Sequence, residues 1–329
     1  MKKQIIAAAV AASVSAVALA DISITGSAKY EYLYTDTPAT ANSSKNESNT
    51  EMKLAINGKK GDTGVFIGVE IDGSDDANNT DEKLDIEDMY ITTKVGDINV
   101  KAGNWTAGSG ALMGELLDRT RASNKVDLST TLGGVKVYAG NSGSNTDDFG
   151  RLNENMYAGA VFNVAGATIE AKHLDPTRDA FGAKGELGGL KYRIEQLNDD
   201  TANSDATFAE ISTKVGGMGV SYAMINSDPA IVTEDDSAIF AVEMGGISSS
   251  TDDGQQQVTL STAVDGNNLT FKVGQIENAF GANADLDYYQ VVASRALASG
   301  ATATVTYTDQ DTSTTATKET LEVELSVSF

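Results

Sequence analysis

The sequence consists largely of short segments in which apolar and polar residues alternate, joined in pairs by tight turns. In the segment 156–174, MYAGAVFNVAGATIEAKHL, two alternating stretches flank Ala165-Gly166. A period of two indicates a β-strand with one apolar and one polar face, and glycine supplies the positive φ that a two-residue hairpin turn needs. Comparable turns are predicted within 58–64 and at Gly96-Asp97, Gly133-Gly134, Gly188-Gly189, Gly216-Gly217, Asp265-Gly266 and Ser299-Gly300.

The connectors between these hairpins are longer and strongly polar. Examples are the segments 35–49, 72–83, 141–155 and 248–256, which are rich in Asp, Asn, Ser and Thr. Because tight turns and long connectors alternate strictly, an up-and-down meander would place every tight turn at one end and every long loop at the other. Eight hairpins and one further strand at each end of the chain predict eighteen strands in all.

The number of strands decides which face of the sheet points inward. The polar positions are often charged, as at Lys53, Glu170 and Lys272, whereas the alternate positions are smoothly apolar, as at Val65 and Ile67. A barrel of about sixteen to eighteen strands is too wide for side chains to fill, so its interior holds water and its apolar face meets lipid. The predicted fold is therefore an all-β, transmembrane, antiparallel up-and-down β-barrel with short periplasmic turns and long extracellular loops. Two or more soluble sandwich domains are the alternative, although no shift of composition marks a linker.

The first twenty residues have the features of a secretory signal peptide. Lys2 and Lys3 precede an uncharged, Ala-rich stretch that ends in Ala18-Leu19-Ala20, and this small-x-small ending is a cleavage pattern. We therefore expect cleavage after residues 1–20, which leaves 21–329 as a single β-barrel domain. A membrane-anchor helix is the alternative, although the stretch is short for a span and no basic stop-transfer flank follows it.

Charge and composition exclude several classes of function. The formal net charge is -23, and loss of Lys2 and Lys3 with the leader takes it to -25. Nucleic-acid binding needs a basic surface and is not expected, whereas an acidic cavity favours cations. The chain has no cysteine, which excludes disulfides, thiol chemistry and Cys-ligated zinc. We expect no metal centre and no cofactor.

Four stretches of the chain resemble the general porins of Gram-negative outer membranes. They are the first strand after the leader, ISITGSAKYEY (22–32), the hairpins 156–173 and 287–309, and the last strand, LEVELSVSF (321–329). The resemblance extends over the whole mature chain. It implies a homotrimeric, water-filled channel for passive diffusion of ions and small hydrophilic solutes, placed in the outer membrane among lipids and lipopolysaccharide. Members of that family commonly have sixteen strands, so the count of eighteen departs from their pattern.

The last strand carries the most specific part of the resemblance. Its apolar residues share one face and end in Phe329. We expect Leu325, Val327 and Phe329 to close the barrel against the first strand. The resemblance also implies that the barrel assembly machinery recognises this C-terminal strand by its terminal aromatic residue.

The connector 104–124, NWTAGSGALMGELLDRTRASN, differs from the other long connectors because it is rich in apolar residues and holds the only tryptophan. It is the third long loop, which in general porins folds into the lumen and forms the constriction. We therefore expect this loop to enter the lumen. An apolar surface loop or a subunit contact is the alternative. The constriction residues implied are Trp105, Glu115, Asp118, Arg119 and Arg121.

The resemblance implies basic side chains on the wall opposite this loop. The lumen-facing candidates are Lys29, Lys53 and Lys101, with Lys191 and Arg193 as a second basic patch. Opposite charges across a narrow aqueous gap would orient dipolar solutes, because the Debye length is about 8 Å at physiological salt. The alternative for each residue is an ordinary solvated position in the lumen. The negative balance of the whole chain predicts a preference for cations.

Acidic pairs recur in the long connectors. None of the pairs has the spacing of a dedicated calcium loop, so simple solvation of the carboxylates is the favoured interpretation. Divalent cations that bridge them to lipopolysaccharide phosphates are the alternative. The pairs are Asp75-Asp76, Asp147-Asp148, Asp235-Asp236 and Asp252-Asp253.

Enzymatic function finds little support in the sequence. His173 is the only histidine, at a strand end with no neighbouring serine and carboxylate arranged as a triad, and an interfacial position is expected for its ring. An outer-membrane enzyme and an exported β-rich adhesin or surface-layer protein are the competing functions. An adhesin would be soluble without detergent, whereas a porin would not.

Overall fold

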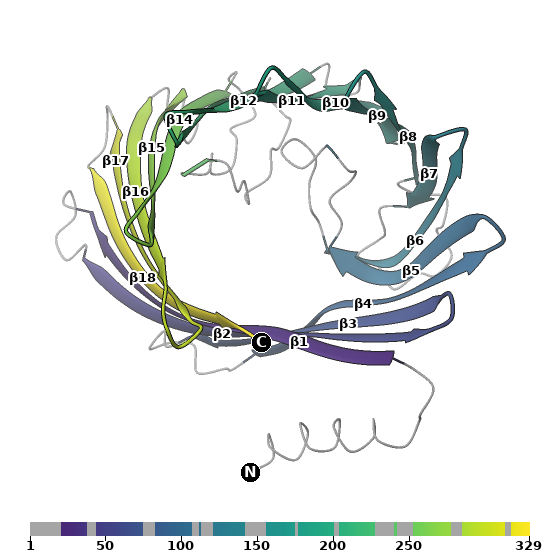
Figure 1. Ribbon diagram of the computed structural model, residues 1–329, viewed down its shortest axis with the longest axis horizontal. Coiled ribbons are helices and arrows are strands. Elements are labelled where there is room, and N and C mark those ends of the chain that lie inside the picture. The colour runs from purple at the N-terminus through teal and green to yellow at the C-terminus, as the bar shows by residue number, and fades with distance from the viewer. Residues whose placement is uncertain are drawn as a thin grey trace, which may run out of the picture.

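The computed structural model describes residues 21–37, 44–74, 83–106, 112, 121–141, 156–174, 177–200, 204–227, 240–241, 253–277, 285–312 and 317–329. These residues form eighteen antiparallel strands that close into one barrel, with β18 paired to β1 (Figure 1). Within them, no helix reaches the length and hydropathy that a membrane span requires. The strands are β1 (Asp21–Asp36), β2 (Lys45–Lys60), β3 (Thr63–Ser74), β4 (Lys83–Val95), β5 (Ile98–Thr106), β6 (Arg121–Leu132), β7 (Val135–Asn141), β8 (Met156–Val164), β9 (Ala167–Leu174), β10 (Arg178–Leu187), β11 (Leu190–Asp199), β12 (Ser204–Val215), β13 (Met218–Ser227), β14 (Asp253–Val264), β15 (Asn267–Glu277), β16 (Leu286–Ala296), β17 (Thr302–Thr312) and β18 (Lys318–Ser328).

The strand count agrees with the hairpin pattern and differs from the sixteen strands common among general porins. Each strand pairs with its neighbours in the sequence, and the pairing of β1 with β18 leaves the eighteen described strands without an unpaired edge. Closure matters in a membrane, because an open edge would leave backbone N–H and C=O groups without partners in hydrocarbon. The predicted antiparallel up-and-down barrel is confirmed.

Short turns gather at one end of the barrel, the turn end, and long connectors at the other, the loop end. Seven hairpins have two-residue turns, and β16 joins β17 through residues 297–301. Gly133 and Gly134 have φ values of 57° and 86°, and Ala165 adopts 48° before Gly166 at 85°. Two-residue hairpin turns of this type need positive φ at both positions, so the turn residues read from the sequence determine where each strand reverses.

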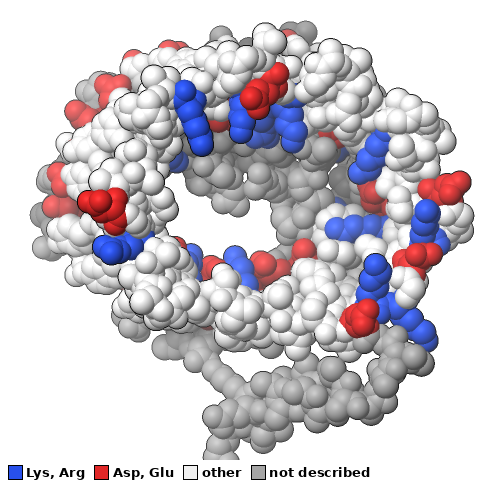
Figure 2. Space-filling view, viewed as in Figure 1, with Lys and Arg blue, Asp and Glu red and all other residues white. Residues whose placement is uncertain are grey.

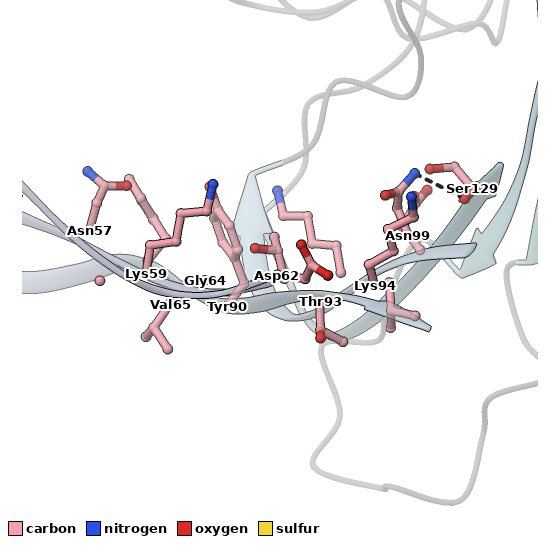
Figure 3. A pocket seen from close by; sticks show the side chains of 16 residues that line it. Asn57, Lys59, Asp62, Gly64, Val65, Tyr90, Thr93, Lys94, Asn99 and Ser129 are labelled. Atoms are coloured by element: carbon pink, nitrogen blue, oxygen red, sulfur yellow. Dashed lines mark hydrogen bonds between the residues drawn. The ribbon is translucent and has the colours of Figure 1, made fainter. Parts of the chain in front are cut away.

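Alternate residues of each strand point to opposite faces of the wall. On β18, the apolar residues at alternate positions from Leu321 to Val327 are exposed on the outer face. Figure 3 shows Asn57 and Lys59 extending from one face of the wall and Val65 and Thr93 from the other. In Figure 2, Lys, Arg, Asp and Glu side chains border the central opening. The charged face therefore points inward and the apolar face outward.

The seam between β1 and β18 sets the last residue against a glycine. Gly26 and Phe329 exchange two backbone hydrogen bonds, each of 2.9 Å. A Cβ on Gly26 would lie 2.7 Å from the Lys53 carbonyl oxygen and 2.8 Å from Cζ of Phe329, so the seam has room only for glycine. Leu325 and Val327 continue the outward apolar face across the same seam.

Two tyrosines on the inner wall each cross a glycine of the neighbouring strand and reach a carboxylate on the strand beyond it. A Cβ on Gly140 would lie 2.6 Å from the Tyr157 hydroxyl oxygen, and Tyr138 crosses Gly159 in the same way. The Tyr157 hydroxyl donates to Asp127 at 2.8 Å. Strands β7 and β8 therefore place hydroxyl donors at fixed positions inside the barrel.

Candidate functional site

One residue of the connector between β5 and β6 is fixed to the inner wall several strands away. Leu112 is 1% exposed. Its backbone N–H donates to Glu170 Oε2 at 2.8 Å, and its carbonyl oxygen accepts from Arg193 Nη2 at 3.3 Å. Glu170 lies on β9 and Arg193 on β11, both on the inner face. The third long connector therefore enters the lumen at Leu112, as predicted.

The two side chains that hold Leu112 are themselves held in place. Glu170 is completely buried, and its other carboxylate oxygen accepts a hydrogen bond of 2.5 Å from the Tyr138 hydroxyl. Arg193 forms an ion pair with Glu195 on its own strand. Hydrogen bonds to ionised groups are roughly twice as strong as neutral ones, so the attachment of Leu112 is firm and specific.

A second connector, between β13 and β14, also reaches the inner wall. Phe240 is buried, and its ring packs edge-on against Phe208 of β12 at a centroid distance of 6.4 Å. The backbone N–H of Ala241 donates to Gln257 Oε1 on β14 at 2.8 Å. Described residues of two connectors therefore lie in the lumen, whereas the sequence pattern predicted one such connector.

A signal for the second connector is present in the sequence. Lumen-facing positions of β11, β12 and β13 near the loop end are apolar, at Leu197, Phe208 and Ile225. An apolar surface inside a water-filled barrel is unfavourable unless another segment covers it. Together with Phe240 these side chains form one buried cluster, whose other members are Leu174, Ala180, Ala206 and Ala223.

Among the predicted constriction residues, Trp105 is the one whose side chain the structure describes. It lies near the end of β5, buried, with its ring edge-on to Tyr90 at 6.1 Å. Lys125 Nζ donates to the Trp105 carbonyl oxygen at 3.2 Å. Glu115, Asp118 and Arg119 lie outside the described residues, and only the backbone of Arg121, the first residue of β6, is described.

The inner wall formed by β18, β1, β2 and β3 is acidic. Lys29 Nζ lies 3.1 Å from Glu31 and 3.6 Å from Glu51, and Lys53 Nζ lies 3.2 Å from Glu51 and 3.5 Å from Glu70. Carboxylates outnumber the two lysines here, so Lys29 and Lys53 face the lumen within an acidic surface and do not form a basic wall. This acidic wall comprises two carboxylate triads, Glu31, Glu322 and Glu324, and Glu51, Glu70 and Asp72, each with oxygen atoms within 4.8 Å of one another.

Lys101 faces the lumen within a stack of aromatic rings. The Phe66 and Tyr90 rings stack at 4.9 Å. Lys101 Nζ lies 3.7 Å from the Tyr90 ring centroid and 4.4 Å from that of Trp105, a favourable arrangement of a cation over ring faces. Lys101, Phe66 and Tyr90 line a cavity of about 620 Å³ on the inner wall of β2 to β6 near the turn end (Figure 3).

The two residues of the second predicted basic patch, Lys191 and Arg193, lie in different surroundings. Arg193 is committed to Leu112 and Glu195. Lys191 is exposed close to the β10–β11 turn, opposite Glu186. The two residues share the inner face of β11, but only Lys191 extends into open water there.

The single histidine lies on the outside of the barrel. His173 Nδ1 is 2.7 Å from Asp179 Oδ1 on the adjacent strand, and both side chains are exposed. The pair points outward near the loop end, on the face opposite that of Glu170 and Lys172. The His173 side chain therefore points away from the lumen, although Glu170 lies on the same strand.

Comparisons with known proteins bear on the fold. No protein-family profile and no curated protein matches this sequence. Among solved structures, Pseudomonas aeruginosa OccK9 (OpdG) is similar at 13% identity with a TM-score of 0.69, covering 94% of this chain and 98% of that chain. Pseudomonas aeruginosa OpdL is similar at 12% identity with a TM-score of 0.70, covering 94% and 99%, and the P. aeruginosa outer membrane protein opdK at 13% with 0.67, covering 94% and 98%. Over nearly its whole length, then, this chain has the fold of these three proteins.

Proposed function

We propose that this chain is an outer-membrane porin that forms a water-filled channel for passive diffusion of ions and small hydrophilic solutes. The observation that carries the proposal is a closed eighteen-strand barrel with a charged inner face and an apolar outer face. A barrel of this width holds water, and its apolar face suits hydrocarbon. In the outer membrane of a Gram-negative bacterium, the turn end then faces the periplasm and the loop end the outside.

We further propose that the channel prefers cations. The acidic wall presents six carboxylates to the lumen around Lys29 and Lys53. Fixed negative charge on a lumen wall raises the local concentration of cations. The formal charge of -23 for the whole chain acts in the same direction.

Several partners and processing steps belong to the same proposal. Residues 1–20 direct export and are then removed, and the mature barrel sits among outer-membrane lipids and lipopolysaccharide as a homotrimer. The barrel assembly machinery recognises β18 and Phe329. The outward position of the Phe329 ring at the seam supports this last role.

The test is conductance of the purified full-length chain in a planar lipid bilayer. Stepwise currents are expected, and a tenfold KCl gradient should give a reversal potential of the cation-preferring sign. A double variant, Glu51→Gln with Glu70→Gln, should reduce that potential, whereas Glu319→Gln, on the outward face of β18, should leave it unchanged. Absence of steps overturns the channel, and an anion-preferring potential overturns the cation preference.

A further inference from the structure

The charges that face the lumen are segregated along the barrel axis. In each of the seven hairpins with a two-residue turn, residues that face each other across the two strands can be numbered as pairs, starting at the turn. In the β2–β3 hairpin, Lys59 with Gly64 is the second pair and Asn57 with Phe66 is the fourth. Because side chains alternate between faces, the second and fourth pairs of every such hairpin face the lumen. These two levels, the periplasmic rows, lie next to the turn end.

The periplasmic rows are strongly basic. They hold eight basic residues and two carboxylates, an excess of six positive charges in a chain whose net charge is negative. Asp21 opposite Lys59 and three turn aspartates lower this excess without reversing its sign. The second pairs contribute Lys59, Lys94, Lys136, Lys191, Lys214 and Glu186, and the fourth pairs Lys101, Lys184, Arg193 and Glu170.

The five lysines of the second pairs form a lysine collar around the periplasmic mouth. They come from β2, β4, β7, β11 and β12, which lie along the part of the wall that runs from β2 to β12 (Figure 1). All five are exposed to water. In Figure 2, Lys and Arg side chains border the opening on several sides.

The charge has the opposite sign further along the axis. In the β2–β3 hairpin, Lys53 with Glu70 is the eighth pair and Glu51 with Asp72 the tenth. The acidic wall therefore begins well inside the basic rows and continues toward the loop end. Its six carboxylates exceed the two lysines among them by four charges.

Two levels of opposite sign in series make ion flow depend on the direction of the field. The Debye length is about 10 Å at 0.1 M salt and about 30 Å at 0.01 M, so at low salt each level sets the local ion composition of the lumen. With the extracellular side positive, cations enriched at the acidic wall and anions enriched at the lysine collar move toward each other and fill the lumen with carriers. With the opposite polarity, cations and anions are both drawn out of the channel, and the lumen between the acidic wall and the lysine collar is depleted of ions.

We propose that the channel is an ionic rectifier that conducts better when the extracellular side is positive. The inference rests on the proposed porin function. It adds a dependence of the current on the sign of the voltage, which cation preference alone does not produce. Current ratios at equal and opposite voltages should reach roughly twofold at 0.01 M salt and approach one at 1 M, where the Debye length is about 3 Å.

Current–voltage curves of the full-length barrel in a planar bilayer test the proposal. The orientation of each inserted channel can be read from a Ser299→Cys variant, because the chain has no cysteine and residue 299 lies in the β16–β17 turn. A thiol-reactive polyethylene glycol added to one chamber changes the current only when the turns face that chamber. Rectification with the stated polarity supports the proposal, and symmetric or opposite curves at 0.01 M salt overturn it.

Replacement of the five collar lysines by glutamine isolates the cause. It should bring the current ratio close to one while stepwise conductance persists. The matched control is Lys60→Gln with Arg295→Gln, which removes charge at the same end but on the outward face and should leave rectification intact. Persistent rectification in the collar variant overturns the assignment to the collar. Loss of all conductance in the parent chain would instead refute the porin function itself.

Discussion

At the scale of single residues, buried charge inside this barrel is tied to the attachment of a connector. Glu170 is completely buried and would be costly there without partners. Both of its oxygens accept hydrogen bonds, from the Leu112 N–H and the Tyr138 hydroxyl. Lys172, two positions along β9, is also buried, with Nζ 4.4 Å from the Tyr157 ring centroid. The inner face of β9 therefore binds the connector between β5 and β6 through Glu170.

Replacing Glu170 by alanine should release the Leu112 attachment. A hydrogen bond to an ionised group contributes about 1.5–3 kcal/mol, so its loss shifts the balance between attached and detached connector by roughly tenfold or more. We expect higher single-channel conductance and a noisier open-channel current. Glu319→Ala, which removes an exposed carboxylate on the outward face of β18, serves as the control. Unchanged conductance and noise in Glu170→Ala would show that the attachment does not control the pore.

At the scale of elements, the seam is the place where closure depends on one small residue. Gly26 sits between the Lys53 carbonyl, the Leu54 side chain and the Phe329 ring, all within 2.9 Å of where its Cβ would be. The neighbouring strand offers a contrast in Gly58, which is also outward-facing and has no atom within 4 Å of an added Cβ.

Gly26→Val should therefore destabilise the closed barrel, and Gly58→Val should not. Overpacking of this kind costs about 1–3 kcal/mol, and here it falls on the strand pair that closes the sheet. The measurement is the temperature at which the folded band on an unheated gel converts to the unfolded band. A lower temperature is expected for Gly26→Val alone. Equal temperatures for the two variants would mean that the seam tolerates a side chain.

Strands and turns were accessible from the sequence because both depend on neighbouring residues. Alternation over a strand and a turn pair such as Gly133-Gly134 are local, and both reappear in the structure. The register shifts at Gly68/Val69 and between Gly103 and Trp105 were not predicted. A bulge adds one residue to one strand only, and alternation read along a single strand contains no information about its partner.

At the scale of the whole molecule, the features that shape the lumen arise from contacts between distant residues. Leu112 meets side chains 58 and 81 positions away, and no local pattern encodes such a meeting. Likewise Glu31 comes opposite Glu324 only when β18 closes on β1. Lys29 was expected on a basic wall, although Glu31 and Glu51 lie within 3.6 Å of its Nζ atom and β18 adds further carboxylates to the same wall. Axial segregation of charge likewise becomes visible only when all hairpins are aligned by their turns.

Closure into one barrel also determines how the chain should behave outside its membrane. Its outward face exposes a continuous band of Val, Ile, Leu and Phe side chains, and the described strands have no unpaired edge through which to unravel. We expect the mature chain to remain with outer-membrane fragments, to require detergent for extraction, and to migrate faster on a gel before boiling than after, because the closed barrel resists detergent unfolding. An exported adhesin with the same strand content would appear in the soluble fraction with one mobility. That outcome would contradict the membrane barrel, since so much exposed apolar surface is not compatible with a soluble monomer.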